Sequence, residues 1–225
     1  MEMKTFLLTA TYLVGIGELI LAIFFWVTHS KSEIRKVMAL LALSTGLWVI
    51  FSGLLAYSLE ASLIINSFVY VFGIFLLTSL VHLAIVFPLP LVHLDRLHRT
   101  LMYLPAALFS IIALTTRTIE LDYVASTTNV GRVVAGPLLP FYNVLLLSLY
   151  LLAVGLLFKQ SKRNDGLNGK NVFLVLLSVI IGGLPAVFID LIWPIFSPDF
   201  VPNFLYGVLS SVIWFATTTY IVLKK

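Results

Sequence analysis

The sequence contains no cysteine and few charged residues, and both absences narrow the class of protein. Without cysteine there is no disulfide framework, no thiolate chemistry and no cysteine-ligated metal. Only 11% of the residues are charged and 60% are hydrophobic, whereas soluble domains carry about a quarter of charged residues. A water-soluble fold does not fit this composition.

Signatures of several membrane and enzyme families are also missing. No lysine lies between Phe204 and Leu223, so a retinal Schiff base of the microbial-rhodopsin type has no attachment point there. That span lacks the NPxxY motif of G-protein-coupled receptors, and GxSxG, HExxH and a phosphate-binding glycine loop do not occur. We therefore expect no enzyme activity, no catalytic residue, no metal site and no cofactor.

What the sequence does contain is seven apolar stretches. A helix needs roughly 20 apolar residues to cross a bilayer, and the stretches predict spans at 6–28, 37–57, 63–87, 101–116, 138–158, 171–193 and 204–223. The predicted fold class is an all-α membrane protein, a single seven-helix transmembrane domain over residues 1–225.

The basic residues predict the orientation of these spans. If the spans cross alternately, only Lys4, Arg117 and Arg132 fall on the side of the N-terminus, and the other lysines and arginines fall on the side of the C-terminus. Basic loops stay in the cytoplasm, so the N-terminus is expected outside and the C-terminus in the cytoplasm, in the plasma (inner) membrane. Basic residues beside helix ends suit anionic lipid, and nucleic acid is not an expected partner.

One long connection, residues 117–136, lies on the outer side. Its TIELDYV segment alternates apolar and polar residues, and a turn-like STTNVG leads to RVVA. Alternation with a period of two predicts an extracellular β-hairpin between the fourth and fifth spans. We expect the hairpin to cap the outer mouth, with Tyr123 and Arg132 as lid residues.

Glu18 is the clearest anomaly, because it lies midway along the first span. A carboxylate there costs about 3 kcal/mol on insertion scales and usually faces the bundle interior. Gly15 and Gly17 precede it and would let a neighbouring helix approach closely. Two interpretations remain open: a protonated glutamate that holds the bundle together, or a site for a ligand or a proton.

Asp190 is the second polar candidate, near the outer end of the sixth span. It follows Gly182, Gly183 and Pro185, which predict a break that could act as a hinge and free carbonyls toward a cavity. An interfacial aspartate that reaches water or Arg132 is the alternative.

His82, near the inner end of the third span, is a third candidate, although most such histidines are satisfied core residues. At a rise of about 1.5 Å per residue, Glu18 lies roughly 18 Å below the outer surface, Asp190 roughly 5 Å and His82 roughly 28 Å. The three therefore cannot form one compact site, and at most they line a polar track. Trp48 and Trp214 are expected to pack inside the bundle and to contribute to the same ligand-binding set.

The layout resembles the seven-helix N-terminal sensor region of bacterial histidine kinases. The resemblance covers nearly the whole chain and is carried by the segments HLAIVFPLP, LLFKQSKRN, IIGGLPAVFIDLIWP and WFATTTYIVLKK. It implies a membrane sensor whose seventh helix passes a signal to cytoplasmic domains. The kinase domains of that family are not in the sequence, which is either a stand-alone relative of the sensor module or a piece of a longer protein.

Three functions remain open. The first is a sensor that binds a small apolar or amphipathic ligand and signals through its seventh helix by a shift in population. The second is a small ion or solute transporter that uses Glu18 and Asp190, although no internal repeat supports it. The third is a subunit that assembles with another membrane protein. The expected partners of the sensor are membrane lipids, the ligand, and either a cytoplasmic signalling partner or a second copy of the chain.

Overall fold

A computed structural model gives the fold and describes residues 2–28, 32–57, 62–92, 94–124, 132–164 and 166–188, with 212, 213, 216, 217, 219 and 220. The elements over residues 2–188 are α1 (Glu2–Val27), α2 (Glu33–Tyr57), α3 (Ser62–Val86), α4 (Arg96–Thr115), β1 (Glu120–Val124), β2 (Arg132–Ala135), α5 (Leu139–Arg163) and α6 (Gly166–Val187). The six described residues after 211 are helical and belong to the predicted span 204–223, whose other residues lie outside the description.

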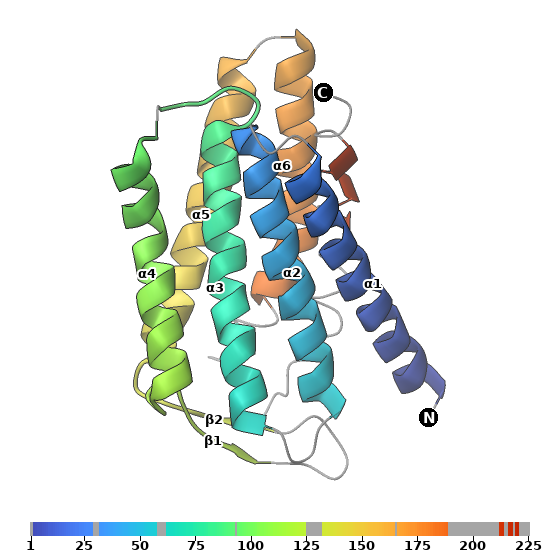
Figure 1. Cartoon of the computed structure of the whole chain (residues 1–225), viewed down its shortest axis with the longest axis vertical. Helices are drawn as coiled ribbons and strands as arrows, with labels where there is room; N and C mark the ends of the chain where they lie inside the picture. Colours follow the sequence, from blue (N-terminus) through green and yellow to red (C-terminus); the bar gives the residue numbers. More distant parts are fainter. Residues whose placement is uncertain are drawn as a thin grey trace.

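The six helices α1 to α6 are each long and apolar enough to cross a membrane. They run alternately in opposite directions, so α1, α3 and α5 end where α2, α4 and α6 begin (Figure 1). We call this the basic end, because most described lysines and arginines lie in or beside these termini: Arg35, Lys36, Arg96, Arg99, Lys159, Lys162, Arg163 and Lys170. The opposite end carries β1 and β2 and is called the hairpin end.

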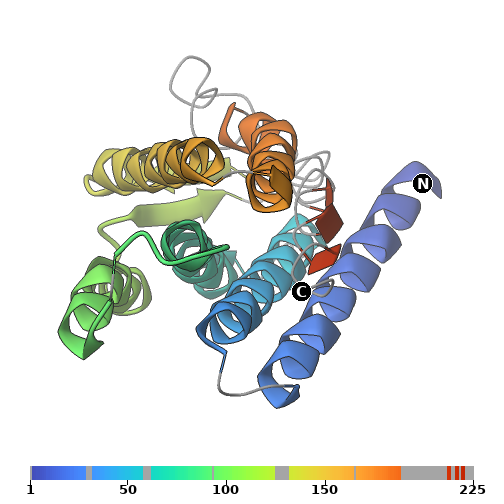
Figure 2. The ribbon, with the colours of Figure 1, turned by 90° about the horizontal axis from the view of Figure 1, so that it is seen from above.

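The centre of the bundle is α3, which packs against α2, α4, α5 and β1. α1 packs against α2, and α6 packs against α5. Seen from above, α1 and α4 lie at opposite edges of the bundle (Figure 2). Most of the surface of α1 and α4 is therefore free to face lipid.

The contact between α1 and α2 depends on a glycine pair. Buried residues of α1 recur every three or four positions, which places them on one helix face: Leu8, Thr11, Gly15, Glu18, Ala22 and Phe25. A Cβ atom added to Gly46 of α2 would lie 2.9 Å from the carbonyl oxygen of Gly15. The two backbones therefore touch at this crossing. A Cβ on Gly17 would meet nothing within 4 Å among the described residues, so the close approach of a helix that we expect at both glycines is seen there only at Gly15.

Helix α4 begins at Arg96 and not at Leu101, where the apolar run begins. The carboxylate of Asp95 explains the earlier start, because it accepts a hydrogen bond of 2.8 Å from the backbone N–H of His98 and caps the helix. The same hydrogen bond, together with one from the His98 side chain, lowers the pKa of Asp95. Pro105 consequently lies inside the helix and not near its start.

Strands β1 and β2 occupy the segment in which the alternation predicts a hairpin. They pair antiparallel, with Tyr123 opposite Val133 and Val124 opposite Arg132. Residues 125–131, which join the strands, lie outside the described residues. Ile119, just before β1, is only 2% exposed. The segment before β1 is therefore packed into the hairpin end of the bundle.

Candidate functional site

Glu18 occupies the buried face of α1 next to the glycine crossing. It is 4% exposed, and among the described residues neither of its carboxylate oxygens has a hydrogen-bond partner. A buried polar group without a partner costs about 1–3 kcal/mol. One of the two interpretations of Glu18 is a hydrogen bond to a neighbouring helix. No described residue accepts or donates such a bond.

The C-terminal helical residues lie close to the same helix. The described residues between 212 and 220, drawn in red, lie between α1 and α6 (Figure 2). Thr219 is 8% exposed, and its hydroxyl has no partner in the part of the chain that is described. Polar groups therefore lie inside the bundle both on α1 and on the C-terminal helix.

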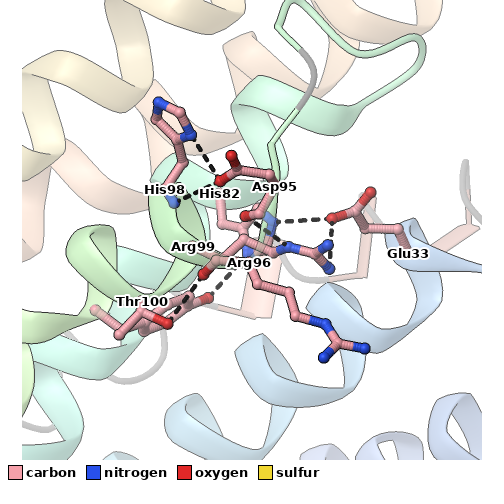
Figure 3. Close-up of polar contacts among 8 residues, drawn as sticks. Glu33, His82, Asp95, Arg96, His98, Arg99 and Thr100 are labelled. Atoms are coloured by element: carbon pink, nitrogen blue, oxygen red, sulfur yellow. Dashed lines mark hydrogen bonds and ion pairs between the residues drawn. The ribbon is translucent and has the colours of Figure 1, made fainter.

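His82 belongs to a second polar group, at the basic end, which we call the Glu33 cluster. It consists of Glu33 of α2, His82 of α3 and Arg99 of α4, which Figure 3 shows, together with Tyr103 of α4. The Nε2 atom of His82 lies 3.6 Å from Oε1 of Glu33, and Nη1 of Arg99 lies 3.3 Å from the same oxygen. On the other side of the ring, Nδ1 of His82 is hydrogen-bonded to the Tyr103 hydroxyl at 3.1 Å. The cluster thus joins three helices.

Glu18 and His82 are not brought together. Glu18 lies in the contact between α1 and α2, whereas His82 faces the first turns of α2 and α4. The expectation that the polar candidates cannot share a compact site agrees with this placement. Asp190 and Trp214 lie outside the described residues, as do the side chains of Tyr123 and Arg132.

The predicted break in the sixth helix is wrong. α6 continues through Gly182, Gly183 and Pro185 and ends at Val187. Tyr150 of α5 supports this stretch, because its hydroxyl donates a hydrogen bond of 3.2 Å to the carbonyl of Val179. A Cβ on Gly183 would lie 2.7 Å from the Tyr150 ring, so this glycine makes room for the tyrosine.

Trp48 contacts the next helix. It is half-buried on α2, and its indole Cδ1 would lie 3.7 Å from a Cβ added to Gly73 of α3. The Tyr142 hydroxyl lies 3.3 Å from the same point and donates a hydrogen bond to the carbonyl of Tyr70 at 2.5 Å. Trp48 therefore packs between helices, as expected, and a part in ligand binding remains a prediction.

Gln160 of α5 is a structural residue that sequence reasoning missed. It is 1% exposed, and its amide donates hydrogen bonds to the carbonyls of Ile85, at 3.4 Å, and Leu89, at 2.8 Å. Asn164 donates to the amide oxygen of Gln160 at 2.9 Å. Gln160 therefore fastens α5 to the end of α3. Its signal in the sequence is a lone amide just after the predicted span, in line with Ala153 and Leu157 on the buried face of the helix.

Replacing Gln160 with methionine should lower the free energy of unfolding by about 2 kcal/mol, because two buried carbonyls lose their donor while the side-chain volume is kept. Thermal unfolding of the purified protein in detergent measures the change. Ser148→Ala on the same helix is the matched control, since the exposed Ser148 hydroxyl bonds only to its own helix. Equal stability of the Gln160 variant and the wild-type protein would show that the two hydrogen bonds do not hold α3 to α5.

Bundled apolar helices of alternating direction, with buried polar groups between them, define a multi-pass α-helical membrane protein. Within the described ranges, no group of three or more histidine, aspartate or glutamate residues could hold a metal ion.

The chain belongs to the family described as the N-terminal 7TM region of histidine kinase, which matches residues 10–224. No curated protein matches the sequence. The matched region is the non-catalytic input part of such kinases, so the chain is a membrane sensor module.

Proposed function

We propose that this sensor module binds a small apolar or amphipathic molecule between its helices, with Glu18 as the polar contact. The observation that supports the proposal is the unsatisfied carboxyl group of Glu18, 4% exposed and without a partner among the described residues. A ligand that carries a hydroxyl or amine group and an apolar body would supply the missing hydrogen bond and remain soluble in the surrounding apolar side chains. Trp48, Asp190 and Trp214 are further proposed contacts.

The signal is proposed to pass through residues 204–223. At the basic end, α2, α3 and α4 are joined by the Glu33 cluster, and α3 and α5 are joined by Gln160. These contacts give the basic end of α2 to α5 a fixed arrangement. A ligand beside Glu18 would then shift α1 and the C-terminal helix against that fixed set, and its effect is limited by its difference in affinity for the two arrangements. α6 is continuous through Gly182, Gly183 and Pro185, and these residues are proposed as a point at which the unbroken helix bends.

The orientation proposed is N-terminus outside and basic end in the cytoplasm of a bacterial plasma membrane. The basic residues at the basic end support it, because cytoplasmic loops carry an excess of lysine and arginine. The hairpin, with Tyr123 and Arg132, would then cover the outer end as a lid. A cytoplasmic signalling partner, or a second copy of the chain, would receive the change at the C-terminal helix, and anionic lipid would contact the basic end.

Native mass spectrometry of the protein in lipid nanodiscs tests the ligand site. We expect a small molecule to remain bound to the wild-type protein and to bind about five- to tenfold more weakly to Glu18→Gln, since one hydrogen bond is worth about 1–1.5 kcal/mol. The control is Thr100→Ala, because Thr100 is exposed on α4 and its hydroxyl bonds to the carbonyl of Arg96 in its own helix. Full retention of the molecule by Glu18→Gln would refute the site.

The same variant separates the sensor from a transporter. Reconstituted vesicles that hold the wild-type protein should show no flux of protons, cations or solutes above that of empty vesicles. Flux that the wild-type protein supports and Glu18→Gln abolishes would overturn the sensor proposal in favour of transport.

A further inference from the structure

The Glu33 cluster has two cationic or potentially cationic groups and only one carboxylate oxygen between them. His82 Nε2 and Arg99 Nη1 lie 3.6 Å and 3.3 Å from Oε1 of Glu33. The side chains differ in their access to water: that of His82 is 7% exposed, whereas those of Glu33 and Arg99 are 43% and 44% exposed. Arg99 can therefore leave the carboxylate for water, and His82 cannot.

The partners of the ring fix its tautomer in the neutral state. A neutral imidazole has one N–H donor and one acceptor nitrogen. At 3.6 Å the contact between Nε2 and the Glu33 carboxylate is an electrostatic one and no hydrogen bond. The negative charge still favours the proton on Nε2, and Nδ1 then accepts a hydrogen bond from the Tyr103 hydroxyl. In this state Arg99 is the one charged partner of Glu33 among the described residues.

A second proton on the ring changes both contacts. Nδ1 becomes a donor, so the oxygen of the Tyr103 hydroxyl must accept this hydrogen bond. The hydroxyl proton of Tyr103 then needs another acceptor. Ser79, one turn before His82 on α3, is buried, and its side chain interacts with the Tyr103 hydroxyl. Its oxygen is therefore a suitable new acceptor for the Tyr103 proton.

The same proton places two positive charges at one carboxylate oxygen. The buried imidazolium is poorly solvated, so its electrostatic attraction to the Glu33 carboxylate is strong. The pair between Arg99 and Glu33 is half-exposed, and such surface pairs contribute little. Protonated His82 should therefore take the carboxylate, and Arg99 should leave it.

We propose that His82 is a proton-binding site whose occupation exchanges the partner of Glu33 and releases the first turn of α4 from α2. Glu33 from α2 and Arg99 and Tyr103 from α4 are the charged and titratable groups that face the ring. The ligand is a proton from the compartment that the basic end faces. The proposal does not rest on a ligand at Glu18.

A pair of spin labels tests the exchange directly. The chain has no cysteine, so Lys36→Cys on α2 and Leu97→Cys on α4, both exposed and outside the cluster, give one unique pair. We expect the distribution of label distances in nanodiscs to broaden or lengthen between about pH 8 and pH 4, a range that reaches low enough to protonate a buried histidine. An unchanged distribution over that range would overturn the proposal.

Three variants identify the group that titrates. His82→Gln should keep the high-pH distribution throughout. His98→Gln is the matched control, because His98 is 63% exposed and pairs with Asp95 of its own helix, and it should shift as the wild-type protein does. Arg99→Gln removes the contact between α4 and Glu33, so it should show the low-pH distribution at every pH. A shift that persists in His82→Gln or in Arg99→Gln, or that disappears in His98→Gln, would contradict the exchange.

Discussion

Replacing Gly46 with valine is expected to lower the free energy of unfolding by roughly 3 kcal/mol, the upper range for overpacking at a close contact. The Cβ atom of the new side chain would lie 2.9 Å from the carbonyl oxygen of Gly15 and 3.1 Å from the side chain of Leu19. A backbone oxygen cannot turn away as a flexible side chain can, so α1 as a whole must move outward. Because α1 packs against α2, most of its buried face would lose contacts.

The matched control for Gly46→Val is Gly17→Val on α1. A Cβ atom at Gly17 meets nothing within 4 Å, so valine there should change the free energy of unfolding by about 0.5 kcal/mol or less. The comparison uses the same change of residue type in two membrane helices. Thermal unfolding of both purified variants in the same detergent gives the two values. Equal loss of stability in the two variants would mean that the glycine crossing does not hold α1 to α2.

Replacing Glu18 with leucine is expected to act in the opposite direction and to raise the free energy of unfolding by about 1–3 kcal/mol. The carboxyl group is buried without a partner among the described residues, and removing such a group recovers its desolvation penalty. A leucine would continue the buried face of α1 that includes Leu8, Ala22 and Phe25. Stability gained by removing a polar residue is expected where that residue is kept for function.

Glu18→Gln is the control for the leucine variant. The amide has nearly the same shape as the carboxyl group and remains polar, so it should recover much less stability than leucine does. Differential scanning fluorimetry of the ligand-free proteins measures the order of the three proteins. If Glu18→Leu is less stable than the wild-type protein, Glu18 holds the bundle together and is not an open ligand contact.

The helices could be predicted from the sequence because their apolar residues run without interruption for the length of a membrane. Their ends were harder to predict, since the chain stays helical after the apolar run stops. α2 begins at the polar residue Glu33, and α5 continues to Arg163. At α4 a single cap, Asp95, decides the start. Hydropathy therefore predicts which residues cross the membrane, whereas capping residues decide where a helix begins.

The polar contacts could be predicted only in part. Glu18 and His82 stand out because a charged or titratable group is rare inside an apolar run. Glu33 and Arg99 do not stand out, since they resemble ordinary charges beside a helix end, and only the packing of α2 and α4 against α3 brings them to His82. That α6 stays helical through Gly182, Gly183 and Pro185 could not be predicted either. The residue that packs against Gly183 is Tyr150, which belongs to another helix.

The most direct test of a sensor with its basic end in the cytoplasm is the accessibility of single cysteines, which the absence of native cysteine makes simple. Arg117→Cys marks the hairpin end and Lys162→Cys marks the basic end, and both positions are exposed. With a membrane-impermeant maleimide on intact bacterial cells, we expect Arg117→Cys to be labelled at once and Lys162→Cys only after the membrane is permeabilised. Labelling of both cysteines in intact cells, or of Lys162→Cys alone, would contradict this orientation and the direction of signalling that depends on it.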